Sequence, residues 1–110
     1  MIKSMTFLKR KPGITKEEFI RHWKDVHASV VPRIIPGLKR YVQLHPIDMP
    51  GFESEFDGVA EIWWESREAV MKYPAWHEGD EARELREDEA KFIDTTKMFR
   101  FFAEEHIIVK

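Results

Sequence analysis

Cysteine is absent from this chain of 110 residues, and its absence removes a group of chemistries. A disulfide, a thiolate zinc site, an iron–sulfur cluster and a cysteine nucleophile all require the cysteine sulfur. The sequence also lacks any apolar run near the roughly 20 residues that span a bilayer, and it shows no secretory leader. We therefore expect a cytoplasmic protein with no membrane partner.

A strong charge of either sign is also lacking, because 18 basic and 20 acidic residues give a net charge of -2. There is no glycine-rich phosphate loop and no G-x-S-x-G nucleophile turn. RNA-recognition domains place a basic residue and two stacking aromatics on one strand, whereas residues 57–61 here read DGVAE, with the charge reversed and the aromatics missing. No nucleic-acid partner is expected.

Aromatic side chains, by contrast, are plentiful, with eight Phe, four Trp and two Tyr. Large flat side chains build cores and also line pockets for apolar ligands. No linker, repeat or low-complexity tract divides the chain. We expect one domain covering residues 1–110.

The apolar pattern and the turn residues predict the element order βαββαβ. Thr15 followed by Glu18 is typical of a capping box at a helix start, and Pro32 and Pro74 are expected to end helices. The expected strands are residues 2–9, 38–45, 58–64 and 95–109, and the expected helices are residues 15–31, 66–73 and 78–94.

This order predicts an α+β, ferredoxin-like subunit, a four-stranded antiparallel sheet with its helices on one face. A sheet with one solvated face alternates apolar and polar residues, yet GVAEIWW (58–64) and KMFRFFA (97–103) are apolar on both sides. Because the chain has nothing left to cover the second face, we expect a homodimer joined through the sheet faces, a dimeric α+β barrel.

The first helix carries the main candidate for chemistry, His27. At about 100° per residue the apolar side chains form one stripe, and His27 lies inside it. A half-buried imidazole titrates near neutral pH and can move a proton, although many such histidines are hydrogen-bonded core residues. The stripe consists of Phe19, Ile20, Trp23, Val26, Val30 and Val31.

A metal site is not predicted. His22 is five residues before His27, about 140° away around a helix, so the two are not expected to chelate one ion. His77, Glu78 and Asp80 form only a weak cluster without helical spacing.

Four stretches of the chain form a recognisable set: FIRHWKDVHASVVPRIIPGLKRYVQLH, FDGVAEIWWES, DEAKFID and the closing EEHIIVK. As a set they resemble the EthD family of dimeric α+β barrel proteins. The resemblance implies a ferredoxin-like subunit, a homodimer and a pocket for an apolar ligand. It does not imply one reaction, because relatives in the wider superfold include cofactor-free monooxygenases, isomerases, cyclases and haem-degrading enzymes. The family's histidine in W-x-x-x-H corresponds to His27.

Further candidates are chosen as neighbours of His27. Tyr41 and Glu61 lie on expected strands and are candidate catalytic partners that orient the imidazole or the substrate; the alternatives are a core edge for Tyr41 and a surface cross-strand pair for Glu61. The expected ligand-binding residues are Trp23, Trp63, Trp76 and His77, with His77 in a loop at the pocket mouth and the tryptophans alternatively part of the core.

These residues favour an enzyme that acts on a small hydrophobic, cyclic or oxygenated molecule by proton transfer, of the isomerase, cyclase or lyase type. His27 is the expected general acid or base, and no cofactor is required. Two alternatives stay open: a non-catalytic ligand-binding accessory protein of an oxidoreductase pathway, and a cofactor-independent monooxygenase. Haem also stays open, since one inward histidine can serve as an axial ligand.

Overall fold

The computed structural model describes residues 2–110 and contains one antiparallel sheet of four strands in the order β2-β3-β1-β4. This is the predicted ferredoxin-like arrangement. The elements are β1 (Ile2–Leu8), α1 (Lys16–His22), the π-helix η1 (Trp23–His27), α2 (Ala28–Ile34), β2 (Leu38–Leu44), β3 (Gly58–Trp64), α3 (Arg67–Glu78), the 3-10 turn η2 (Asp80–Ala82), α4 (Arg83–Phe92) and β4 (Phe99–Glu104).

The predicted start of the first helix is confirmed, but two predicted helix ends are wrong. Thr15 Oγ1 accepts from the Glu18 backbone and the Glu18 carboxylate accepts from the Thr15 backbone, which completes the capping box. Pro32 and Pro74 both lie inside helices, in α2 and α3. Each proline removes one backbone hydrogen bond, but the buried residues beside them, Val31 and Tyr73, hold the helices against the core.

The last two elements also differ from the prediction. The expected helix 78–94 divides into η2 and α4, and the expected strand 95–109 shortens to β4. Residues 107–109 are apolar but exposed, because β4 pairs with β1 only as far as Glu104.

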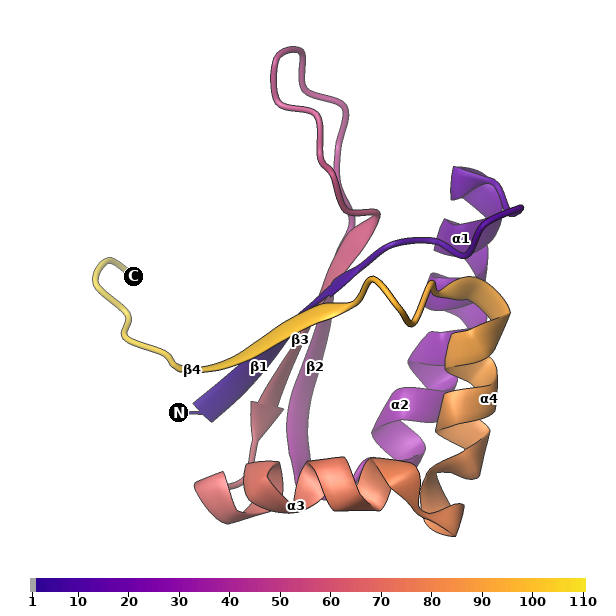
Figure 1. The fold of residues 1–110 in the computed structure, drawn as a ribbon. Coiled ribbons are helices and arrows are strands. Elements are labelled where there is room, and N and C mark those ends of the chain that lie inside the picture. Colours follow the sequence, from indigo (N-terminus) through magenta and orange to yellow (C-terminus); the bar gives the residue numbers. More distant parts are fainter. Residues whose placement is uncertain (1) are drawn as a thin grey trace.

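The helices cover one face of the sheet and leave the other open (Figure 1). On the covered face, Thr6 of β1 pairs with Ala60 of β3 and with Arg100 of β4, while Tyr41 of β2 pairs with Ile62 of β3. Neighbouring residues along a strand point to opposite faces. The covered face is therefore where the side chains of sheet and helices meet.

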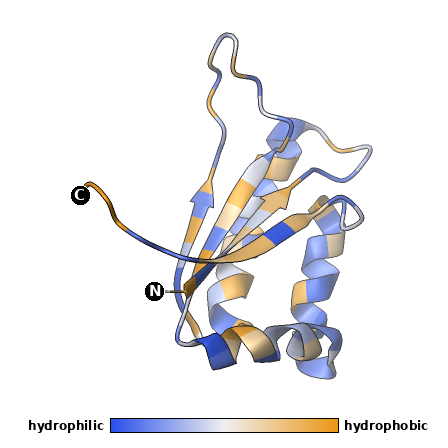
Figure 2. Ribbon diagram, turned by 60° about the vertical axis from the view of Figure 1, so that its left-hand side comes forward, coloured by the Kyte–Doolittle hydropathy of each residue, from blue (hydrophilic) through white to orange (hydrophobic). Residues whose placement is uncertain are grey.

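On the open face, Met5 of β1 pairs with Glu61 of β3 and with Phe101 of β4. Phe7, on the same face, contacts Phe99 and Phe101 with ring centroids 5.8 and 6.1 Å apart. Phe99 and Phe101 are exposed, and Figure 2 shows apolar segments along the strands. The open face thus presents apolar side chains to solvent.

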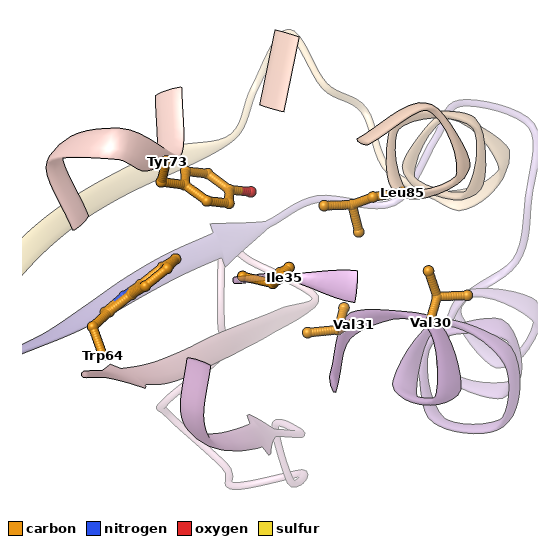
Figure 3. Packing of buried hydrophobic residues seen from close by; sticks show 6 residues of the cluster. All are labelled: Val30, Val31, Ile35, Trp64, Tyr73 and Leu85. Carbon is orange, nitrogen blue, oxygen red and sulfur yellow. The ribbon is translucent and has the colours of Figure 1, made fainter. Parts of the chain in front are cut away.

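The larger part of the core lies where α2, α3 and α4 meet the sheet (Figure 3). It consists of Val30, Val31, Ile35, Trp64, Tyr73 and Leu85, all buried. A second cluster joins Phe19 and Trp23 to Phe92 of α4. Trp23 lies directly on Gly58, where a β-carbon would overlap the indole ring, so this contact requires glycine at position 58.

The π-helix η1 interrupts the first helix at Trp23–His27. A π turn contains an extra residue, which rotates the side chains beyond it relative to an α-helix. Val26, expected in the apolar stripe, is consequently 42% exposed, whereas His27 is only 6% exposed. The local change of helix type thus determines which side chain enters the core.

Candidate functional site

A small cavity lies between the covered face of the sheet and the helices. It offers about 40 Å³ to water-sized molecules, which is room for only a few of them and far less than a haem needs. Most of its wall is aliphatic or aromatic. Its polar wall residues are Thr6, His27, Tyr41, Tyr73, Glu89 and Arg100.

His27 is held in this cavity by a buried carboxylate on α4. Its Nδ1 lies 2.7 Å from Asp88 Oδ2, and both side chains are buried. An ionised carboxylate only accepts hydrogen bonds, so Nδ1 carries the proton and Nε2 of the neutral ring has a free lone pair. No hydrogen bond to Nε2 is found within residues 2–110. The Asp88 contact thereby fixes the ring and leaves Nε2 as a hydrogen-bond acceptor.

The same carboxylate binds a second histidine. His22 Nε2 lies 2.8 Å from Asp88 Oδ1, and the rings of His22 and His27 both contact Phe92, with centroids 4.6 and 4.9 Å from it. The expected separation of about 140° between the two histidines is wrong, because the π turn between them brings both rings to one side. Asp88 is thus shared by two imidazoles.

Burial determines the protonation of His27 near neutral pH. Desolvation lowers the pKa of His27 below its usual 6.5, although the hydrogen bond and the charge of Asp88 and the charge of Glu89 oppose that change. The lowered pKa means that the ring is neutral at pH 7. A neutral imidazole with a free Nε2 is the form that a general base needs.

Tyr41 and Trp23 line the same cavity as His27. Gln43 Nε2 donates to Tyr41 Oη and to the Trp23 carbonyl, both at 2.9 Å. Burial raises the pKa of Tyr41, so its phenol keeps its proton. Trp23 Nε1 is buried and has no hydrogen-bond partner within residues 2–110.

Glu61 and Trp63 are separated from His27, because both lie on the open face of the sheet. Glu61 is 3.6 Å from Lys3 Nζ, and the Trp63 ring lies between Lys3 and Arg40, at 4.8 and 4.6 Å. Strand alternation assigns residues to two faces but does not say which face the helices cover. The expectation that Glu61 and Trp63 adjoin the pocket is therefore corrected.

Trp76 and His77 lie in α3 and reach the cavity only indirectly. The loop expected around His77 is wrong, because α3 continues past Pro74 to Glu78. Trp76 packs on Tyr73 outside the cavity, with centroids 5.8 Å apart. His77 Nε2 lies 2.9 Å from Glu89 Oε1, so it touches a wall residue rather than the cavity itself.

Sequence reasoning missed Asp88, Glu89 and Arg100 as candidate site residues. Asp88 and Glu89 share the buried side of α4 with Leu85 and Phe92, at the helical spacing that marks a core-facing side. Acidic residues at such spacing were a usable signal, since a buried carboxylate needs partners. Arg100 likewise sits between apolar neighbours in the run MFRFF.

The described residues were also searched for a metal site and for a membrane-spanning helix. Within residues 2–110, no three His, Cys, Asp or Glu side chains gather as metal ligands would. In the same part of the chain, each helix is too short or too polar to cross a membrane.

The fold and the cavity together define a ferredoxin-like α+β subunit with a histidine–carboxylate pair between its helices and its sheet. The EthD domain matches residues 11–96, which is most of the sequence. The chain belongs to the EthD domain family. No curated protein matches it.

Solved structures share the fold. An EthD family protein of Bacillus halodurans is 24% identical with a TM-score of 0.71, over 96% of this chain and 100% of that one. A protein of Bacteroides fragilis, described as dimeric with a ferredoxin-like fold, is 12% identical with a TM-score of 0.65, over 94% and 95%. A protein of Nitrosomonas europaea, named provisionally as an antibiotic biosynthesis monooxygenase, is 15% identical with a TM-score of 0.57, over 96% and 98%.

Proposed function

We propose that this protein is a cofactor-free enzyme that moves a proton on a small, mainly apolar, oxygenated molecule. The observation that carries the proposal is the pair formed by His27 and Asp88. The carboxylate orients the imidazole through Nδ1 and leaves Nε2 free on the wall of the cavity. Tyr41, with its phenol protonated, supplies a hydroxyl donor on the same wall.

The reaction begins when His27 Nε2 takes a proton from the bound molecule. The imidazolium that forms is stabilised by Asp88, whose carboxylate accepts a charge-assisted hydrogen bond from His27 Nδ1–H. His27 then returns the proton to another atom of the same molecule, so that the net change is an isomerisation, or to a leaving group in an elimination. The apolar wall limits access of bulk water while the charge exists.

One positioned acid–base group contributes roughly 10²- to 10⁴-fold to a rate. The substrate must therefore have an acidic C–H bond, such as the one beside a carbonyl group. The limited free volume favours a small substrate, because a larger one must displace wall side chains that are tightly packed.

The test is deuterium incorporation from D₂O into a panel of small ketones, keto acids and lactones, followed by proton NMR. We expect the wild type to exchange C–H protons of at least one compound and His27→Gln to lose roughly 10²- to 10⁴-fold of that rate. His106→Gln is the matched control, because His106 is exposed. Equal exchange by wild type and His27→Gln would contradict the proposal.

A cofactor-independent monooxygenase is the second candidate, since the Nitrosomonas europaea protein of similar fold carries that provisional name. In that reaction His27 removes the same proton and the resulting carbanion reacts with O₂. Oxygen consumption measured with the same panel separates the two reactions. Binding without exchange or oxygen uptake would instead support the accessory, ligand-binding function.

We further propose that two copies associate through their open sheet faces. A contiguous aromatic group lies on this face and consists of Phe7, Phe99 and Phe101. Exposed apolar groups of this kind mark surfaces that bind another protein. A protein of the same fold is described as dimeric. A second copy, packed sheet to sheet, would bury both apolar faces at once.

A further inference from the structure

Arg100 brings a permanent positive charge to the wall of the cavity. Its position on β4 is set by the pairing with Thr6, whose Oγ1 accepts from Arg100 Nε at 2.9 Å. Its guanidinium carbon lies 5.3 Å from the centre of the Tyr73 ring. One edge of the guanidinium is thus held in place by the protein.

No carboxylate of residues 2–110 forms an ion pair with Arg100. The nearby acidic groups have other partners: Glu89 binds His77 and Asp88 binds both His22 and His27. Burial raises the pKa of Tyr73 to about 12, so its phenol is uncharged at neutral pH. A partly buried cation usually has an anionic partner, and here the protein supplies none.

We propose that Arg100 binds the carbonyl oxygen of the substrate and that the substrate is a small enolisable carbonyl compound. This inference rests on the proposed function. When His27 acts as the base, the carbonyl oxygen of the substrate receives the electron pair, and Arg100 is the group that binds this oxygen. His27 Nε2 takes the α-proton, the C–H electron pair becomes the new C=C bond, and the carbonyl π pair moves to the oxygen. The resulting enolate has its negative charge next to the guanidinium.

The guanidinium matches this role in geometry and in charge. Its planar N–H groups donate in parallel to a planar oxygen group. Thr6 uses Nε and Tyr73 accepts from the guanidinium as well, so the N–H groups left by these two partners are available. Donors fixed before the reaction stabilise a developing oxyanion without reorganisation. Trp23 Nε1 is a second buried donor among the residues that line the cavity, and it lies next to the Tyr41 hydroxyl.

The experiment uses propanoate as a stable mimic of the planar, negatively charged enolate and propanamide as its neutral counterpart. Binding to the intact protein is followed by NMR, including the Arg100 Nε–H resonance. We expect propanoate to shift that resonance and to bind more tightly than propanamide, by roughly 10- to 100-fold, as for hydrogen bonds to a charged group.

The matched variants are Arg100→Met, which keeps length and removes charge, and Arg83→Met, since Arg83 is exposed on α4. We expect Arg100→Met to lose the tenfold or greater preference for propanoate and Arg83→Met to keep it. If Arg100→Met does not fold, two other measurements replace it. The first is the shift of the wild-type Arg100 resonance on addition of propanoate, and the second is the preference for propanoate in Arg100→Lys, which keeps the charge. Equal binding of the two probes, or an unmoved Arg100 resonance at saturation, overturns the proposal.

Oxygen binding by Arg100 and proton transfer by His27 can be tested separately. His27→Gln is expected to bind propanoate as the wild type does, because the oxygen site does not need the base. If propanoate binds through Arg100 but no compound exchanges deuterium, the oxygen site stands and the catalytic role of His27 fails. If exchange occurs and propanoate does not bind, the role of Arg100 fails alone.

Discussion

At the scale of single residues, His27 illustrates how burial and hydrogen bonding act in opposite directions. Desolvation disfavours the charged ring, whereas Asp88 favours it, and the net effect is a pKa below 6.5. His27 therefore stays neutral at neutral pH and still keeps the carboxylate that orients its ring.

The lowered pKa of His27 predicts a pH dependence of stability. Below pH 6.5 the unfolded chain binds a proton at this position before the folded chain does, so the free energy of unfolding falls as the pH decreases from 6.5 through the lower pKa of the folded state. His45, whose pKa burial also lowers, contributes with the same sign.

Urea unfolding between pH 5 and pH 7.5 measures this effect. We expect His27→Gln to show a smaller loss of stability on acidification than the wild type, and His106→Gln to behave as the wild type. An unchanged slope in His27→Gln would show that the ring titrates in the folded protein as it does in the unfolded chain.

At the scale of elements, the site depends on the contact between η1 and α4. The π turn brings His22 and His27 to one side, and α4 presents Asp88 to both rings. The two elements are 61 residues apart at the His27–Asp88 contact, so this hydrogen bond also joins distant parts of the chain.

Replacing Asp88 by Asn tests this contact. The amide keeps one acceptor oxygen and replaces the other with an NH₂ donor, so one imidazole must change its tautomer or lose its partner, and the charge assistance disappears. We expect the free energy of unfolding to decrease by about 1–3 kcal/mol, measured by urea denaturation. Glu87→Gln, an exposed neighbour on α4, is the control and should change it by under about 0.5 kcal/mol. Equal stability of the two variants would show that the shared carboxylate is unimportant for the fold.

At the scale of the whole molecule, the helices protect one face of the sheet and leave the aromatic face open (Figure 1). The cavity lies on the covered side, so association through the open face leaves access to the cavity unchanged within each subunit. The loop between β2 and β3, residues 45–57, extends away from the sheet (Figure 1) and exposes Ile47 and Phe52.

The proposed dimer predicts a specific effect of charge on the open face. Phe101→Glu would place a carboxylate against the same group of the second copy, where desolvation and repulsion oppose association. We expect the wild type to sediment as a dimer and Phe101→Glu as a monomer in analytical ultracentrifugation. Met71→Glu, an exposed position on α3, should remain dimeric. A wild type that stays monomeric at high concentration would contradict the proposed interface.

The element order, the capping box and the inward position of His27 follow from the sequence alone, because turn chemistry and apolar periodicity act between near neighbours. Even the need to cover both faces of the sheet is visible in the composition of residues 58–64 and 97–103. These are local signals that the printed residues carry directly.

Only the tertiary structure decided which groups meet His27. Strand alternation could not distinguish Tyr41, on the covered face, from Glu61, on the open one, since both faces are apolar. Helical spacing from Leu85 and Phe92 was an available signal for an inward Asp88, but it could not show that a π turn would rotate two histidines onto that carboxylate. Such pairings depend on contacts between segments tens of residues apart, and their energies are determined only when the core has packed.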